Sequence, residues 1–124
     1  MPSAAEPIAP DYSGPNVRGI VPALLAPGSA AGPSWLDPAI MSARQVVLLV
    51  LDGLGWEQLR ARPHLAPTLS GATGIDQPIT SIAPTTTAAA LTSITTGTPP
   101  SRHGILGYRL AEGDQILNML RWTL

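Results

Sequence analysis

Proline spacing constrains the first third of this chain more than any other feature. Eight of the fourteen prolines lie within residues 1–40, so few stretches there are free of proline. Proline lacks a backbone N–H donor and clashes with the preceding helical turn, which excludes long helices and central strands. We therefore predict an irregular Pro/Ala-rich arm over residues 1–42, with one short helical turn around Ala23–Leu25. The arm is expected either to cover a surface or to remain mobile.

The pattern changes after the arm. Val46–Leu51, with the sequence VVLLVL, is an unbroken apolar run that ends at Asp52 and Gly53. Six apolar residues without polar alternation are typical of a strand buried on both faces of a parallel sheet. Ile79–Ala83, with the sequence ITSIA, lies between two prolines and is predicted to form a second strand. The predicted fold class is therefore α/β, with a mostly parallel sheet flanked by helices.

Local signals also predict two helices and a hairpin. The sequence WEQLRAR, residues 56–62, is predicted to form a helix that ends before Pro63. A second helix is predicted over Thr87–Thr96, because Gly97 is suited to the left-handed conformation that often ends a helix. The sequence YRLAEGDQILNML is predicted to form a hairpin about Gly113.

Charge and composition exclude several classes of function. Seven arginines without lysine oppose eight acidic residues, so no basic field exists to bind nucleic acid or an anionic membrane. The absence of cysteine excludes disulfides, thiolate zinc sites and cysteine nucleophiles, so any metal must be held by oxygen or histidine. The chain shows neither a signal-peptide pattern nor a membrane span, and we expect a cytoplasmic protein. Its oligomeric state is left open.

Two polar sites follow the predicted strands. Asp52 follows the first strand and the triplet Thr85–Thr87 follows the second, so both are expected at one edge of the sheet, where α/β sites gather. A hydroxyl in the first turn of a helix lies among unpaired N–H groups that suit a phosphate. An alcohol is a weak nucleophile, and no histidine or lysine lies nearby in the sequence. A metal-activated hydroxyl with Asp52 as oxygen ligand is the preferred interpretation.

Simpler interpretations exist for the same residues. An Asp after a buried strand is often a turn former or a helix N-cap, and a Thr before a helix is usually a cap. His64 and His103 are expected to be structural or exposed rather than catalytic. The alternative function is therefore a non-catalytic α/β remnant or interaction module, in which Asp52 and Thr87 only cap helices.

The sequences VVLLVLDGLGW and APTTTAAALTSITTGTPPSRHGILGY together resemble the opening of the alkaline phosphatase superfamily, specifically its type I phosphodiesterase/nucleotide pyrophosphatase branch. That branch has a metal-binding Asp in a D-G motif, a nucleophilic Thr in a P-T-x-T segment and a T-G-x-x-P-x-x-H-G-I block. Asp52 matches the metal ligand, Thr87 matches the nucleophile, and residues 96–105 match the block. The two motifs span residues 46–108.

The resemblance implies a fold and a mechanism. The fold would be alkaline-phosphatase-like, and two divalent ions, usually zinc, would flank the reacting phosphorus. Asp52 and Thr87 would both be ligands of the ion that activates the Thr87 hydroxyl. Thr87 would attack in line and form a phospho-threonine intermediate, which splits one hard displacement into two easier ones. The implied reaction is hydrolysis of phosphodiester or phosphoanhydride bonds in a small phosphoester or nucleotide-like substrate.

Two positions depart from the family pattern near the substrate. Tyr108 stands where the family usually has a phosphate-binding Asn, and we assign it to substrate binding because a phenol can still donate one hydrogen bond. Ala88 replaces the hydrophobic residue that stacks on a nucleobase in many members. Diesters, pyrophosphates and monoesters therefore all remain open as substrates.

A third departure concerns the other metal ligands. In the family these come from far later in a large domain, and neither His64 nor His103 matches one of those positions. The resemblance therefore implies that residues 43–124 are the N-terminal portion of a truncated phosphodiesterase domain. We expect the 124-residue chain by itself to be an inactive fragment with an incomplete metal site.

Overall fold

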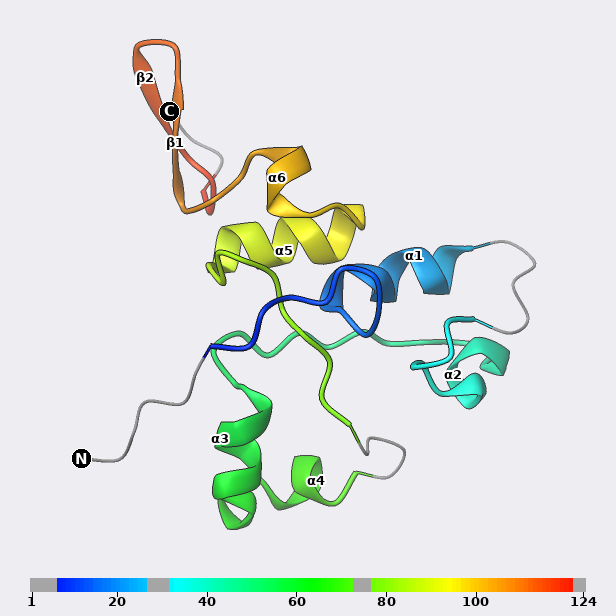
Figure 1. Cartoon of the computed structure of the whole chain (residues 1–124). Coiled ribbons are helices and arrows are strands. Elements are labelled where there is room, and N and C mark those ends of the chain that lie inside the picture. Colours follow the sequence, from blue (N-terminus) through cyan, green and yellow to red (C-terminus); the bar gives the residue numbers. More distant parts are fainter. Residues whose placement is uncertain (1–6, 27–31, 73–76, 122–124) are drawn as a thin grey trace.

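The computed structural model describes residues 7–26, 32–72 and 77–121 (Figure 1). The elements are, in chain order, η1 (Val17–Gly19), α1 (Ile20–Leu25), α2 (Pro38–Ser42), α3 (Trp56–Ala61), η2 (Pro63–Leu65), α4 (Pro67–Ser70), α5 (Thr87–Thr96), α6 (Pro100–His103), β1 (Arg109–Glu112) and β2 (Gln115–Asn118). Here η denotes a 3₁₀ helix. Across these described ranges, no helix has the length and apolar character that crossing a membrane requires.

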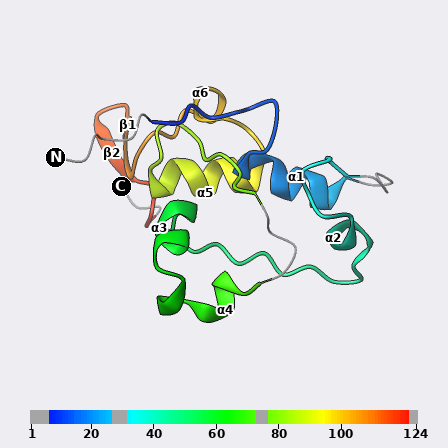
Figure 2. The same ribbon diagram turned by 60° about the horizontal axis from the view of Figure 1, so that its bottom comes forward.

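Helix α5 is the centre of one packed group of helices. Its buried face consists of Ala88, Ala89, Ser93 and Ile94, and the small side chains among them let neighbouring segments approach closely. The helices η1, α1 and α6 all contact α5. Figures 1 and 2 both show α1 beside the C-terminal end of α5. The helix ends as predicted, because Gly97 has a φ of 70° and its N–H binds the carbonyl of Ser93.

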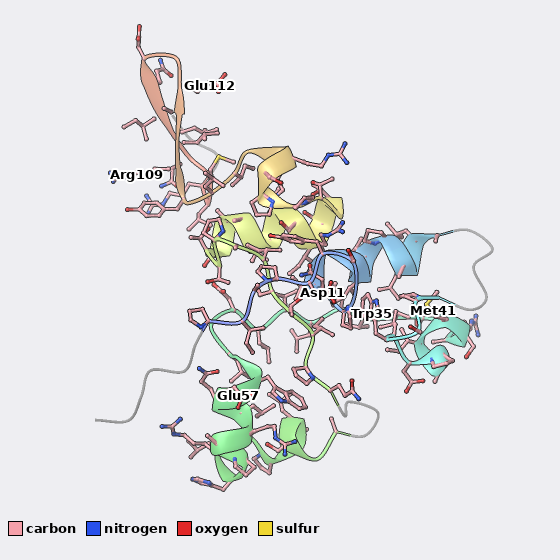
Figure 3. All side chains as sticks on the ribbon, in the orientation of Figure 1. Asp11, Trp35, Met41, Glu57, Arg109 and Glu112 are labelled. Atoms are coloured by element: carbon pink, nitrogen blue, oxygen red, sulfur yellow. The ribbon has the colours of Figure 1, made fainter. Side chains whose placement is uncertain are left out.

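The predicted hairpin is present after α6. Strands β1 and β2 are antiparallel, with Arg109 opposite Asn118 and Glu112 opposite Gln115. Gly113 follows β1 with a φ of 58°, a conformation that glycine adopts without steric cost. The hairpin projects from the rest of the chain, with Arg109 near its base and Glu112 near its tip (Figure 3).

The predicted strand Val46–Leu51 does not form. The segment runs as a single thread between α2 and α3 in both ribbon views, and all six side chains are exposed, Val47 by 91%. A buried strand requires a neighbour that accepts and donates its backbone hydrogen bonds. Within the described residues the only sheet is the hairpin β1–β2, so the expectation of a mostly parallel sheet is wrong for this structure. The described chain is a small α/β arrangement with one antiparallel pair.

The predicted strand Ile79–Ala83 is also absent. Only Thr80 pairs, through an isolated parallel bridge with Asn16 of the arm. The bridge does not extend because the arm turns into η1 directly after Asn16. Ile82 nevertheless packs inside the molecule, with only 1% of its surface exposed.

Two segments rich in proline contain more helix than predicted. The predicted turn at Ala23–Leu25 belongs to the longer helix α1, and α2 is an additional helix within the arm. Pro22 lies in the first turn of α1 and Pro38 begins α2, where a backbone N–H would have no partner within the helix. Helix α3 ends before Pro63, as predicted.

Candidate active site

Asp52 lies in a tight turn that follows the apolar segment Val46–Leu51. The N–H of Leu54 reaches the carbonyl of Leu51 at 3.5 Å, and Gly53 has a φ of 76°. A positive φ at this place of a turn favours glycine, which explains the Asp-Gly pair. The turn exposes the Asp52 side chain to solvent and directs it towards α5.

Thr86 and Thr87 of the threonine triplet have different roles at the start of α5. Thr86 is the N-cap: its backbone is extended, and its hydroxyl accepts a hydrogen bond from the N–H of Ala89 at 3.4 Å. The same hydroxyl donates to the carbonyl of Leu106 at 2.8 Å, which holds the loop after α6 against the start of α5. Thr87 is the first residue inside the helix, so its hydroxyl is not used as a cap.

Asp52 and Thr87 lie together although they are 35 residues apart in the chain. The Thr87 hydroxyl donates a hydrogen bond to the Asp52 Oδ2 atom at 2.8 Å. The interpretation that both residues only cap helices is wrong, because Thr86 caps α5 and the N-cap position of α3 is Gly55. Asp52 does serve as a turn residue. The carboxylate oxygens of Asp52 and the hydroxyl of Thr87 lie together at the start of α5.

The site contains oxygen donors of the kind that bind metal ions. A carboxylate and a hydroxyl are suitable oxygen ligands for a divalent ion, whereas catalytic zinc sites take three protein ligands. No group of three or more His, Asp or Glu side chains that could hold an ion occurs in the described part of the chain. Asp52 and Thr87 are therefore two oxygen donors that could bind an ion.

His103 serves the packing of α6 on α5. The Ile105 N–H donates to its Nδ1 atom at 3.1 Å, so in the neutral ring Nε2 carries the proton and donates to the Ser93 hydroxyl at 2.9 Å. Burial lowers the pKa of His103, because the charged imidazolium is less well solvated there. His64 is exposed in η2. The prediction that His103 is structural agrees with these contacts.

The T-G-x-x-P-x-x-H-G-I block forms the end of α5, the short loop after it and helix α6. Gly97 and Gly104 end α5 and α6, each with a positive φ, of 70° and 77°. Pro100 is buried at the first position of α6, where its missing N–H has no consequence. The block therefore fixes where the loop that binds Thr86 begins.

The two residues that depart from the family pattern have different environments. Ala88 is 95% buried, so its side chain does not lie on the surface of the site. Tyr108 is about half exposed, and the Arg109 guanidinium lies 5.4 Å from the centre of its ring. Its loop is connected to the site through the Leu106 carbonyl and Thr86. Within the described residues, no hydrogen bond joins Tyr108 to Asp52 or Thr87.

Comparison with protein families is decisive for the identity of the chain. Residues 46–119 match the model of the family described as type I phosphodiesterase / nucleotide pyrophosphatase, and this is more than half of the chain. The chain belongs to this family. The phosphodiesterase match contains Asp52, Thr87 and Tyr108, and the family is one of hydrolases. Neither the curated proteins nor the solved structures gave a match.

Sequence reasoning missed the residues of the arm that contact the segment before Thr87. Tyr12 and Asn16 both form hydrogen bonds with residues 80–83, more than sixty positions away. An Asn before a short helix is a recognisable N-cap, and Asn16 does cap η1. Nothing local in the sequence indicates its distant partner.

Proposed function

We propose that the full-length protein is a metal-dependent phosphodiesterase or nucleotide pyrophosphatase that uses Thr87 as its nucleophile. The observation that supports this most directly is the 2.8 Å hydrogen bond from the Thr87 hydroxyl to Asp52, inside the family match. A hydroxyl that serves neither as a cap nor in the core is available for chemistry. Its only hydrogen is directed to a carboxylate, which leaves the oxygen lone pairs free to face a phosphorus atom.

The reaction follows from this arrangement. The Thr87 oxygen forms a bond to phosphorus as the bond to the leaving alcohol or phosphate breaks on the opposite side. The hydroxyl proton leaves along the existing hydrogen bond towards Asp52. A water molecule then cleaves the phospho-threonine and returns the free hydroxyl.

The start of α5 supports the binding of a phosphate oxygen. Thr87 and Ala88 lie in the first turn, where backbone N–H groups have no acceptor within the helix. These donors and the positive end of the helix dipole favour a negatively charged group. The buried Ala88 offers no surface for a nucleobase, so recognition of the phosphate group dominates in this part of the site.

A carboxylate alone is a weak base for an alcohol. Divalent ions, held in part by Asp52 and Thr87, would supply the positive charge that lowers the pKa of the hydroxyl. Since the described residues provide only part of such a site, we propose that residues 1–124 alone are inactive. The alternative function, a non-catalytic interaction module, predicts no turnover by residues 1–124 and none by the full-length protein.

The test uses the full-length protein and bis-nitrophenyl phosphate. Thr87→Ala should abolish turnover, whereas Thr85→Ala, an exposed neighbour outside the helix, should retain it. After an acid quench, a phosphorylated peptide containing residue 87 is expected from the parent only. Near-parental turnover by Thr87→Ala would show that another residue is the nucleophile.

The role of Asp52 is tested separately, through metal content. Asp52→Asn preserves size and most of the turn, but removes the charge that an ion requires. Elemental analysis of the purified full-length protein should show less bound metal, together with lower activity. Equal metal content in the variant and the parent would exclude Asp52 as a ligand.

A further inference from the structure

Among the described residues of the arm, Asn16 is the most deeply buried polar residue, and it forms hydrogen bonds with residues distant in the sequence. Only 1% of its surface is exposed. Its amide donates to the Thr80 hydroxyl at 2.9 Å and to the Ser81 carbonyl at 2.7 Å, and its Oδ1 accepts the Arg18 N–H at 3.1 Å. These bonds are partly buried, so losing the two donated bonds weakens the connection to residues 80 and 81: the Ser81 carbonyl loses its bond to the arm, and the Thr80 hydroxyl keeps only the N–H of Asp11 as a donor.

Backbone contacts and Tyr12 extend this connection towards the proposed nucleophile. Val17 donates its N–H to the Thr80 carbonyl at 3.0 Å, and Thr80 donates to the Pro15 carbonyl at 2.9 Å. The Tyr12 hydroxyl accepts the N–H of Ala83 at 3.1 Å. Ala83 is four residues before Thr87, so the arm holds the chain immediately before the site.

The arm also reaches the opposite end of α5. The Arg18 guanidinium donates to the Gly97 carbonyl at 2.9 Å and to the carbonyl of Tyr12, and it lies over the Tyr12 ring. A cation at a helix C-terminus is favourable, because the last carbonyls carry partial negative charge. Trp35 of the arm lies beside the start of α1, where a side chain at Gly19 would meet it (Figure 3).

We propose that residues 12–18 of the arm position the nucleophile, with Tyr12 and Asn16 as positioning residues that hold Thr80–Ala83 in place. The proposal rests on the proposed function of Thr87. In-line attack requires an accurately placed oxygen, and a displacement of about 1 Å can cost about a hundredfold in rate. These residues lie outside the family match, which begins at residue 46.

The test compares three variants of the full-length protein with bis-nitrophenyl phosphate as substrate. Tyr12→Phe removes the acceptor for the Ala83 N–H and keeps the ring, and Asn16→Asp removes the two donated bonds and keeps the acceptor. Asp37→Ala is the control, because it removes one hydrogen bond elsewhere in the arm, the N-cap of α2.

A positioning role predicts a loss in kcat with little change in KM. We expect kcat to fall about threefold to tenfold in Tyr12→Phe and about tenfold to a hundredfold in Asn16→Asp, with KM within about twofold. Amide hydrogen exchange should accelerate over residues 80–87 in both. Asp37→Ala should leave kcat and this exchange at parental values. If Asn16→Asp does not fold, Tyr12→Phe decides.

The outcomes separate this proposal from the proposed function. Parental kcat in Tyr12→Phe, or exchange over residues 80–87 that is unchanged in it, overturns the role of the arm. An equal fall of kcat in Asp37→Ala also overturns it, since any loss of arm stability would then suffice. Parental turnover by Thr87→Ala refutes the nucleophile instead, whatever the arm variants do.

Discussion

Two features of the structure require glycine at position 97: its backbone conformation and its close contact with the arm. Alanine substitutions at Gly97 and at a matched control glycine separate the two effects. Its φ of 70° costs an L-residue about 1–2 kcal/mol. A Cβ at this position would lie 2.4 Å from the Pro22 Cγ atom, whereas carbon atoms in contact are about 3.5–4.0 Å apart. Relieving such an overlap in a packed region typically costs about 1–3 kcal/mol. Gly97→Ala should therefore destabilise the chain by about 2–5 kcal/mol.

Gly104 is the matched control. Its φ of 77° is nearly the same and it also ends a helix, but a Cβ there would meet no atom within 4 Å. Gly104→Ala should therefore cost only the backbone term, about 1–2 kcal/mol. Urea unfolding of the 124-residue chain, followed by circular dichroism, gives both values on the same scale.

A second substitution isolates the contact with Pro22. Combining Gly97→Ala with Pro22→Ala removes the Cγ atom that the new methyl group would overlap. The double variant should be less destabilised than the sum of the single changes, by about 1–3 kcal/mol. Equal losses for Gly97→Ala and Gly104→Ala, with additive behaviour in the double variant, would refute the docking of the arm on Gly97.

Three further predictions concern the chain itself. Thr86→Ala should cost about 1–2 kcal/mol in urea unfolding, because the cap to Ala89 and the bond to Leu106 are lost; Thr86→Ser should cost much less, and equal losses would exclude the hydroxyl as the cause. Because burial lowers the pKa of His103, stability should be complete above a pH of about 6.5 and fall as the pH decreases through that value; a parental pH dependence in His103→Gln would contradict this. Val47→Lys, at a side chain that is 91% exposed, should leave the unfolding midpoint unchanged and reduce light scattering at high concentration, and a lowered midpoint would show that Val47 is buried.

The parts of the fold that were predictable depend on neighbouring residues alone. Helix α5 has a capping threonine before it and Gly97 after it, and the hairpin has Gly113 at its turn. The strand Val46–Leu51 was not predictable in the same way, because an apolar run becomes a strand only where another strand pairs with it. Its apolar composition indicates burial, whereas the structure leaves it exposed.

The candidate site was predictable to a similar degree. The resemblance indicated Asp52 and Thr87, and the structure places their side chains in contact. The sequence did not predict that Thr86 caps α5 while Thr87 is the first residue of the helix. Any threonine in the triplet could start a helix, and Thr86 is held at the cap by a bond to the distant Leu106 carbonyl. Asn16 and Tyr12 were missed because their partners are distant in sequence.

The attachment of the arm to α5 has a consequence for synthesis on the ribosome. The arm is made before α5, and the Gly97 carbonyl that Arg18 binds is 79 residues further along the chain. At a translation rate of about 5–20 residues per second, about 4–16 s pass between the synthesis of Arg18 and that of Gly97. During this interval the arm has neither its hydrogen bonds to residues 80–83 nor the helix on which it packs. Slower translation of residues 19–97 would lengthen the period in which this proline-rich segment is exposed to proteases and chaperones.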